Sequence, residues 1–350
     1  MINKTSKLLS LRYKKIFFLN RSKWNKLKLS LDQVNISSHE SCPICRCEEV
    51  YLISEVDRVG FPCDTVLCKQ CEFVFNNSFI DNASEFYTHK WGEDRWGDPE
   101  KNFLNRTSSD SFSWKRAAFL LKKLEKHFLQ INSVLEVGCG DGCNLLPYHL
   151  MGKLVTGCDF DTRFLEPGRK RGLNLVQGDI NNISDENGFD LIMLIHTFEH
   201  VLNLDETINL VSKHLRSNGF VFVEVPGIIG WNQTRADSAQ SMGLNSSNNF
   251  LNYLQFQHNY HFKLKHLKKV WERNGFEMIY GDEWVRAIFR QKEAVKSKLY
   301  NDHDLKNRTK KDSSYNTITH LNKVEKDFLK VSNIICGLGR LVLRKLKIID

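Results

Sequence analysis

The stretch that most restricts the fold of this chain is VLEVGCGDG, residues 134–142. A short apolar run is followed by Gly138, Gly140 and Gly142, each separated by one residue. Glycine adopts the positive φ angles that other residues avoid, so this run predicts a tight turn between a strand and a helix. The backbone amides of such a turn commonly hold a nucleotide. We therefore expect a nucleotide-binding α/β domain here.

Residues 131–290 alternate between strand-like and helix-like patterns. The predicted strands are SVLEV (133–137), KLVTGCD (153–159), LNLVQ (173–177), FDLIMLIH (189–196) and GFVFVEV (219–225). Most are continuous apolar runs, which favour a parallel sheet covered by helices on both faces. FEMIYGDEWVRAIFRQ (276–291) predicts two further strands joined by a tight Gly-Asp turn.

Two helices can be described more closely. WKRAAFLLKKLEKHFLQ (114–130) predicts a helix with Ala118, Leu121, Leu124 and Phe128 on one face. The helix that follows the second strand contains Pro167. Since proline is tolerated only near a helix start, we expect this helix to end by residue 166.

The residues around the glycine loop favour S-adenosylmethionine over a dinucleotide. A dinucleotide loop has a third small residue, usually glycine or alanine, where this chain has Cys143. Glu136 precedes the loop by two residues, and its carboxylate would repel a pyrophosphate. The same carboxylate could bind the ammonium group of S-adenosylmethionine.

Three later positions complete the predicted cofactor site. Asp159 ends the second strand, where it can accept two hydrogen bonds from a ribose diol. Phe160 follows it and is a candidate contact. Asp179 ends the next strand, where it could accept from the adenine amino group while Ile180 packs on the ring.

In this order, VLEVGCGDG, VTGCD, VQGDI and FDLIMLIHTFEHV resemble the successive motifs of class I S-adenosylmethionine-dependent methyltransferases. The resemblance covers roughly residues 131–290. It implies a Rossmann-like sheet and S-adenosylmethionine as cofactor. Two rival interpretations are an NAD-dependent oxidoreductase and an α/β domain whose glycines only make turns.

The cysteines predict a metal site. Cys42 and Cys45 form one C-x2-C pair, Cys68 and Cys71 form another, and 22 residues separate the pairs. Each pair can direct two thiolates at one point, as a tetrahedral structural Zn²⁺ site requires. Reduced core cysteines are the alternative. Cys47 and Cys63 are then buried thiols or alternate ligands.

A zinc-binding segment before such a domain resembles a methyltransferase subfamily that includes sugar C-methyltransferases and enzymes of surface-polysaccharide clusters. The resemblance implies a small zinc-ribbon domain before the Rossmann-like sheet. It also implies a small-molecule acceptor, a saccharide or a nucleotide- or lipid-linked sugar. A non-enzymatic zinc-ribbon adaptor on a methyltransferase scaffold is the rival interpretation.

Methyl transfer needs alignment of the reactants and, for most acceptors, a base. His258 is the first candidate, followed by His200 and His196, because these residues lie after the fourth and fifth strands. In the sugar C-methyltransferases a Glu-His pair lies near the substrate, and the matching residues here are Gln257 and His258. The missing carboxylate makes O- or N-methylation at least as consistent as C-methylation. The polar insertion at 226–252 is a candidate substrate cap.

Charge is distributed unevenly along the chain. Residues 1–31 carry nine Lys and Arg and no acid, and residues 285–350 carry sixteen against seven acids, which leaves the centre acidic. Nucleic-acid binding would instead need a basic folded domain, so we expect no nucleic-acid partner. The basic ends suit either an anionic membrane surface or simple solvation.

No apolar run is long enough to span a bilayer, so we expect a cytoplasmic protein, with peripheral contact at the inner face of the membrane as an option. Nothing in the sequence sets the oligomeric state. The expected organisation is a basic leader (1–38), a zinc-binding domain (39–82), an aromatic and helical connector (83–130), a methyltransferase domain (131–290), a polar linker (291–325) and a basic amphipathic helix (326–350).

Overall fold

The computed structural model describes residues 3–7, 36–57, 62–81, 98–108, 110–184, 188–228 and 253–292. The predicted C-terminal helix, most of the basic leader and most of the insertion at 226–252 lie outside these residues. Within them, no helix has both the length and the apolar character to cross a membrane.

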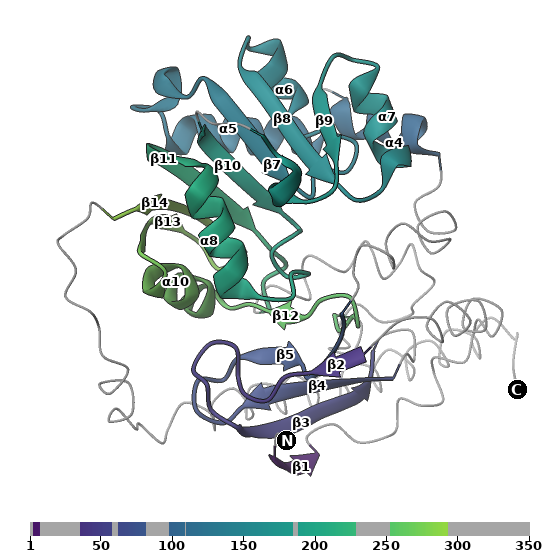
Figure 1. Cartoon of the computed structure of the whole chain (residues 1–350), viewed down its shortest axis with the longest axis vertical. Helices are drawn as coiled ribbons and strands as arrows, with labels where there is room; N and C mark the ends of the chain where they lie inside the picture. Colours follow the sequence, from purple (N-terminus) through teal and green to yellow (C-terminus); the bar gives the residue numbers. More distant parts are fainter. Residues whose placement is uncertain are drawn as a thin grey trace, which may run out of the picture.

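The larger sheet has seven strands in the order β13-β14-β11-β10-β7-β8-β9 (Figure 1). Its parallel strands are the five expected from the sequence: β7 (Ser133–Val137), β8 (Leu154–Asp159), β9 (Asn174–Gln177), β10 (Phe189–Ile195) and β11 (Leu215–Glu224). β13 (Phe276–Gly281) and β14 (Arg286–Gln291) add an antiparallel edge. The predicted α/β class is confirmed.

The central strands are mostly apolar, and both faces of the sheet are covered. On β10, Ile192 and Leu194 belong to the core that includes α8 (Leu204–His214) and α10 (Leu264–Arg273). Leu191 and Met193 belong to a second core on the opposite face. That face is covered by α5 (Phe112–Lys123), α6 (Leu146–Leu150) and α7 (Thr162–Arg169), with α4 (Pro99–Thr107) outside them. Successive residues of a strand point to opposite faces, so each run supplies both cores.

The buried face of α5 differs from the prediction. Ala117, Leu120 and Leu124 are buried, whereas Ala118 and Leu121 are exposed. The helix ends at Lys123, and Phe128 is buried in a separate short helix, η3 (Phe128–Gln130). Two adjacent leucines fit either register of the apolar stripe, and contact with the sheet selects the one that buries Leu120.

The predicted end of α7 is also wrong, since the helix passes through Pro167 and continues to Arg169. Asp161 caps its start by accepting a hydrogen bond from the amide of Arg163. Pro167 and Gly168 are both buried. A Cβ on Gly168 would overlap the carbonyl oxygen of Asp141 in the glycine loop. The helix therefore continues through Pro167, and its Pro-Gly pair packs closely against the glycine loop.

The connection between β13 and β14 is longer than a Gly-Asp turn. Gly281 ends β13, and four residues, 282–285, join the strands. The carboxylate of Asp282 accepts hydrogen bonds from the amides of Trp284 and Arg286. Asp282 therefore organises the turn through its side chain, and the glycine is part of the strand.

The N-terminal part forms a second sheet in the order β1-β3-β4-β5-β12. Its strands are β1 (Asn3–Lys7), β3 (Glu49–Val56), β4 (Pro62–Cys68), β5 (Val74–Asn76) and β12 (Tyr260–His261). β2 (Ile36–Ser38) and β6 (Ser78–Ile80) pair separately. We call residues 36–57 and 62–81 the ribbon. Its cysteine pairs and β-structure fit the predicted small zinc ribbon.

The ribbon shares its core with the rest of the protein. β12 comes from the region after β11, yet it pairs with β5. Phe73 and Phe75 lie in the same apolar cluster as Leu267 and Trp271 of α10. The boundaries proposed from the sequence stay a prediction, but the ribbon and the α8–α10 layer bury one continuous apolar surface.

Asn76 makes the polar link across this junction. Its fully buried side-chain nitrogen donates to the carbonyl oxygens of Gln255, Phe256 and His258 at 2.9, 3.2 and 2.9 Å. Its backbone amide donates to the carbonyl of Asn259 at 2.9 Å. These bonds bring a donor to buried carbonyl groups of the turn, of which the Gln255 carbonyl also accepts the amide of His258 at 3.1 Å.

We predict that Asn76→Ala lowers the free energy of unfolding by about 2–4 kcal/mol, because it removes a buried side-chain donor to these carbonyl groups. Urea denaturation measures the change. Asn77→Ala is the matched control, since the buried side-chain oxygen of Asn77 accepts no hydrogen bond from the described residues. Equal losses in the two variants would contradict a specific role for the Asn76 amide.

Candidate active site

The predicted site residues lie at the carboxyl edge of the larger sheet. β7 is flanked by β8 on one side and β10 on the other, so the chain reverses its direction of progress across the sheet at β7. Open α/β sheets bind ligands at such a switch point. The hydroxyl of Thr197, after β10, donates to the carbonyl of Val137 at 3.0 Å. The loops after β7 and β10 are therefore in contact.

All three loop glycines have the predicted positive φ, at 69° for Gly138, 53° for Gly140 and 77° for Gly142. A Cβ on Gly138 would overlap the side chain of Thr197, and one on Gly142 would lie 2.9 Å from a methyl of Leu173. A Cβ on Gly140 would meet no atom within 4 Å. Gly140 therefore faces open space, as a cofactor cradle requires.

Asp159 holds the loop to the end of β8. One carboxylate oxygen accepts the amide of Gly140 at 2.9 Å, and the other accepts the amide of Asp161 at 3.1 Å. Burial raises the pKa of Asp159, and these amide bonds oppose the rise. Each oxygen of a carboxylate has a second lone pair, so the group retains acceptor capacity for a diol.

The other cofactor candidates lie nearby but differ in exposure. Phe160 is partly buried next to Asp159, and Asp179 is partly buried at the start of η4 (Ile180–Asn182). The carboxylate of Asp179 accepts the amide of Asn181 at 2.9 Å. Ile180 is only 3% exposed and packs in the core. The Ile180 side chain is therefore part of the apolar core, in addition to any contact with an adenine ring.

Glu136 is fully buried behind the loop. One carboxylate oxygen accepts from the side-chain amide of Asn144 at 2.7 Å, and among the described residues the other has no hydrogen-bond partner. Burial raises the pKa of Glu136 to about 8, although Asn144 and the nearby Arg116 lower it. A buried carboxyl oxygen without a donor fits a cationic ligand group such as an ammonium.

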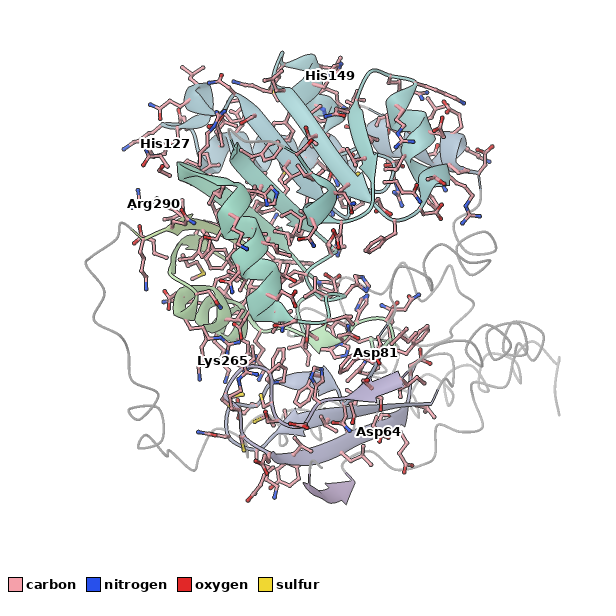
Figure 2. The ribbon with its side chains drawn as sticks, in the orientation of Figure 1. Asp64, Asp81, His127, His149, Lys265 and Arg290 are labelled. Carbon is pink, nitrogen blue, oxygen red and sulfur yellow. The ribbon has the colours of Figure 1, made fainter. Side chains whose placement is uncertain are left out.

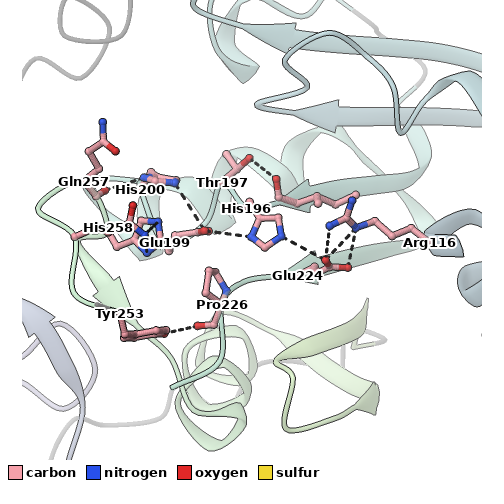
Figure 3. Close-up of polar contacts among 12 residues, drawn as sticks. Arg116, His196, Thr197, Glu199, His200, Glu224, Pro226, Tyr253, Gln257 and His258 are labelled. Carbon is pink, nitrogen blue, oxygen red and sulfur yellow. Dashed lines mark hydrogen bonds and ion pairs between the residues drawn. The ribbon is translucent and has the colours of Figure 1, made fainter. Parts of the chain in front are cut away.

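A row of charged side chains that the sequence did not reveal crosses the edge. Arg116 of α5 donates two parallel hydrogen bonds to Glu224 at the end of β11, at 3.0 and 2.6 Å (Figure 3). Burial would raise the pKa of Glu224, but His196 and Arg116 lower it to about 2. Glu224 could have been predicted as a site residue, because it is an acid at the carboxyl end of a predicted parallel strand. The helix pattern contained none for Arg116.

His196 lies between two carboxylates of this row. Its Nε2 is 3.5 Å from Glu224 and its Nδ1 is 3.6 Å from Glu199 (Figure 3). Burial alone would lower its pKa, but Glu199 and Glu224 outweigh burial and raise the pKa to about 9. His196 has a φ of 53° and a half-exposed side chain. At neutral pH it is therefore a cation facing the site.

The structure brings together His200 and His258, which come from distant parts of the chain. Their ring centroids are 4.8 Å apart and the rings are nearly perpendicular, at 83° (Figure 3). Nδ1 of His200 is 2.7 Å from the carbonyl oxygen of Gln257, and the buried His258 ring contacts the Gln255 side-chain amide. Fully buried Glu199 lies 3.7 Å from Nε2 of His200.

The four predicted zinc ligands also converge. Their sulfur atoms lie within 4.8 Å of one another, with Cys42 to Cys71 at 3.5 Å and Cys45 to Cys68 at 3.4 Å. Four sulfurs on one Zn²⁺ at about 2.3 Å are separated by about 3.8 Å, so the set fits the ion. Figure 2 shows sulfur atoms gathered in the ribbon near Lys265.

The two cysteine turns have the same backbone geometry. The amide of Arg46 donates to the carbonyl oxygen of Cys42 at 2.9 Å, and the amide of Glu72 donates to the carbonyl oxygen of Cys68 at 3.0 Å. Arg46 and Glu72 both have positive φ, at 62° and 63°. Two matching turns that face each other are what a tetrahedral thiolate site requires.

Cys47 and Cys63 lie outside this quartet. Burial raises the pKa of both thiols, and the Cys47 sulfur lies 3.7 Å from the carbonyl oxygen of Glu49.

Comparison with known proteins identifies the domain. Residues 108–280 match the family described as a methyltransferase domain. Together with the strand order and the loop geometry, this match supports a methyltransferase domain at residues 108–280, which are just under half of the chain. The predicted resemblance to methyltransferases is confirmed at the level of this domain.

Curated relatives are similar over part of their length. Ubiquinone biosynthesis O-methyltransferases of Rickettsia prowazekii and Vibrio atlanticus are 27% and 29% identical over 116 and 136 residues, which cover 31% and 37% of this chain. The chain spans about half the length of these relatives, 46% and 55%.

Solved structures with lower similarity include an S-adenosylmethionine-dependent methyltransferase from Clostridium acetobutylicum, 15% identical with a TM-score of 0.41, which covers 55% of this chain and 96% of that one. An amino pentose methyltransferase from Micromonospora echinaspora is 13% identical with a TM-score of 0.40. This match also covers 55% of this chain and 96% of that one.

The buried carboxyl of Glu136 leads to a pH prediction. Its pKa is raised from 4.5 to about 8, so between these values the folded protein binds more protons than the unfolded chain, and stability falls as pH rises. Glu136→Gln removes this titration. We therefore expect its free energy of unfolding, relative to that of the wild type, to rise by about 1.4 kcal/mol per pH unit across that window.

Urea denaturation at pH 5.5, 6.5 and 7.5 measures this trend. The exposed Glu125→Gln is the control and should show no comparable trend. A constant difference between Glu136→Gln and the wild type over these pH values would contradict the raised pKa.

Proposed function

We propose that this protein transfers a methyl group from S-adenosylmethionine to a hydroxyl group of a small saccharide or of a nucleotide- or lipid-linked sugar. The observation that carries the proposal is the hydrogen bond between the Gly140 amide and Asp159, which joins a positive-φ glycine loop to an acid at the end of the neighbouring strand. The match of residues 108–280 to methyltransferase domains supports it.

The cofactor residues divide into two groups. Gly138, Gly140 and Gly142 give the loop a shape without side chains, and Glu136 has a buried oxygen suited to an ammonium group. Asp159 would bind the ribose diol, while Phe160, Asp179 and Ile180 would line the adenine position. S-adenosylmethionine supplies, when bound, a methyl group on a positively charged sulfur.

The chain must remove the proton of the acceptor. A new bond forms between the acceptor oxygen and the methyl carbon while the carbon–sulfur bond breaks, so the hydroxyl proton must leave for a base. We propose that His258 or His200 takes this proton. His196 has a pKa of about 9 and is already protonated at neutral pH. It would instead stabilise negative charge on the acceptor oxygen.

Two observations favour a hydroxyl acceptor. The Glu199 carboxylate lies 3.7 Å from Nε2 of His200, beyond a hydrogen bond. A hydroxyl needs less help from a base than a carbon-bound proton. The curated relatives are named as O-methyltransferases, although of ubiquinone biosynthesis. The ribbon beside the site supports a saccharide, by resemblance to methyltransferases with an N-terminal zinc domain.

We also propose that Cys42, Cys45, Cys68 and Cys71 bind one structural Zn²⁺. Four protein ligands fill a tetrahedral site and leave no position for a substrate. Arg273 of α10 donates to the carbonyl groups of Pro43 and Ile44, and His266 donates to that of Cys71. The metal would therefore hold both cysteine turns against α10.

We predict that Asp159→Ala weakens S-adenosylhomocysteine binding by about 2–3 kcal/mol, because it removes a charge-assisted bidentate contact. Calorimetric titration measures this with the wild type as reference, NAD⁺ as the control ligand and Asp81→Ala as a remote exposed variant. Unchanged affinity would remove Asp159 from the site. NAD⁺ binding in place of S-adenosylhomocysteine would favour an oxidoreductase, and binding of neither would favour an adaptor.

The acceptor class is tested with S-adenosylmethionine that carries a labelled methyl group and a panel of nucleotide sugars, lipid-linked sugars and polyprenyl phenols. Label on a sugar hydroxyl is the expected result. Label only on the phenol would replace the saccharide with an acceptor like that of the curated relatives. If a protein that binds S-adenosylhomocysteine transfers label to none of these compounds, all of these acceptor classes are excluded.

We predict that purified protein contains one zinc per chain and that Cys68→Ser reduces this content by at least about tenfold, because a thiolate ligand is lost. Elemental analysis measures the metal. Cys47→Ser is the matched control, since its sulfur lies outside the quartet. Zinc loss in Cys47→Ser with retention in Cys68→Ser would mean that the ligand set is different.

A further inference from the structure

Glu199, His200 and His258 form a second cluster of metal-ligating side chains in the described part of the chain. One donor atom from each lies within 4.8 Å of the others. Glu199 and His200 follow β10, and His258 precedes β12, so the cluster lies at the acceptor side of the site, next to the ribbon junction. It contains nitrogen and oxygen donors only, unlike the ribbon quartet.

Glu199 is the first reason to expect a cation here. Its side chain is 1% exposed, and neither carboxylate oxygen has a hydrogen-bond partner among the described residues. Its contacts with Nδ1 of His196 and Nε2 of His200 are 3.6 and 3.7 Å, longer than hydrogen bonds. A buried carboxylate in this state needs further compensation, and a metal ion supplies it directly.

The tautomer of His200 is the second reason. Nδ1 lies 2.7 Å from the carbonyl oxygen of Gln257, and a carbonyl can only accept, so Nδ1 carries the proton and donates. In the neutral ring, Nε2 then presents a lone pair toward Glu199. Two acceptors that face each other require a proton or a cation between them. A carbonyl bond to the far nitrogen is also the usual support of a metal-bound histidine.

We propose that Glu199, His200 and His258 bind a divalent first-row metal ion, such as Mn²⁺, which holds the acceptor hydroxyl. Metal bonds of about 2.1 Å separate neighbouring ligands by about 3–3.5 Å, so the 3.7 Å between Glu199 and His200 needs a small contraction. His258 would rotate further toward them. Three protein ligands leave open positions, as in catalytic sites.

The role of this ion rests on the proposed function, but its binding does not. The hydroxyl oxygen would coordinate the ion and release its proton more readily, because a cation stabilises the resulting oxyanion. The proton would pass to solvent. With a metal bound, His200 and His258 would be ligands and not bases.

Mn²⁺ is the probe, because it favours nitrogen and oxygen ligands over the thiolates of the ribbon. Full-length, zinc-containing protein is titrated with Mn²⁺ while electron paramagnetic resonance follows the free ion. One equivalent should bind to the wild type. Glu199→Gln and His258→Gln should each weaken binding at least about tenfold. His127→Gln is the matched control, because His127 lies at the far end of the larger sheet from the ribbon (Figure 2).

Zinc content and S-adenosylhomocysteine affinity are measured on the same samples, so that misfolded variants are recognised. No Mn²⁺ bound by wild-type protein that binds S-adenosylhomocysteine would overturn the metal site and leave the proposed function intact. Equal Mn²⁺ binding by Glu199→Gln, His258→Gln and the wild type would overturn the ligand assignment. Mn²⁺ bound through these residues without S-adenosylhomocysteine binding would support the site and count against methyl transfer.

Discussion

The part of the candidate site that holds His200 and His258 depends on one buried amide, the side chain of Asn76. Its nitrogen donates to three carbonyl groups of residues 255–258, which lie roughly 180 residues further along the chain. Asn259 continues the link, because its side chain donates to the carbonyl groups of His200 and Val201 after β10. Without these bonds a polar turn could not be buried between two sheets. Contacts with the ribbon therefore fix the position of His258, in addition to contacts within its own domain.

Fixed positions matter because the site holds four charged side chains, of which His196 is half exposed and the others are largely buried. Arg116, Glu224, His196 and Glu199 alternate in sign across the carboxyl edge, and each intermediate group has a partner on either side. Removing one member would leave a neighbour buried and unpaired, which costs more than an intact pair gains. The row ends at Glu199, whose oxygens accept no hydrogen bond within the described residues. The demand for a cation is therefore greatest at the Glu199 end of the row.

The two sides of the site differ in how they could be predicted. The cofactor side is built from short consecutive segments, so the glycine pattern and an acid after the next strand predicted the loop, and the structure has the positive φ angles that it needs. The C-x2-C spacing likewise predicted converging thiols. Predictions failed where packing chose between local options, as in the exposed Leu121 of α5 and the helix that continues through Pro167.

The sequence by itself determined the strands of the parallel sheet, the glycine turn and the cysteine pairs, because each follows from residue preferences within a few positions. Only the tertiary structure decided that β12 joins the ribbon sheet, that Arg116 meets Glu224, and that His258 lies against His200 beside Glu199. These contacts join residues that are 58 (His200 and His258) to 185 (Phe75 and Tyr260) positions apart. Burial of a shared core sets them, and no local pattern records which distant side chains that core brings together.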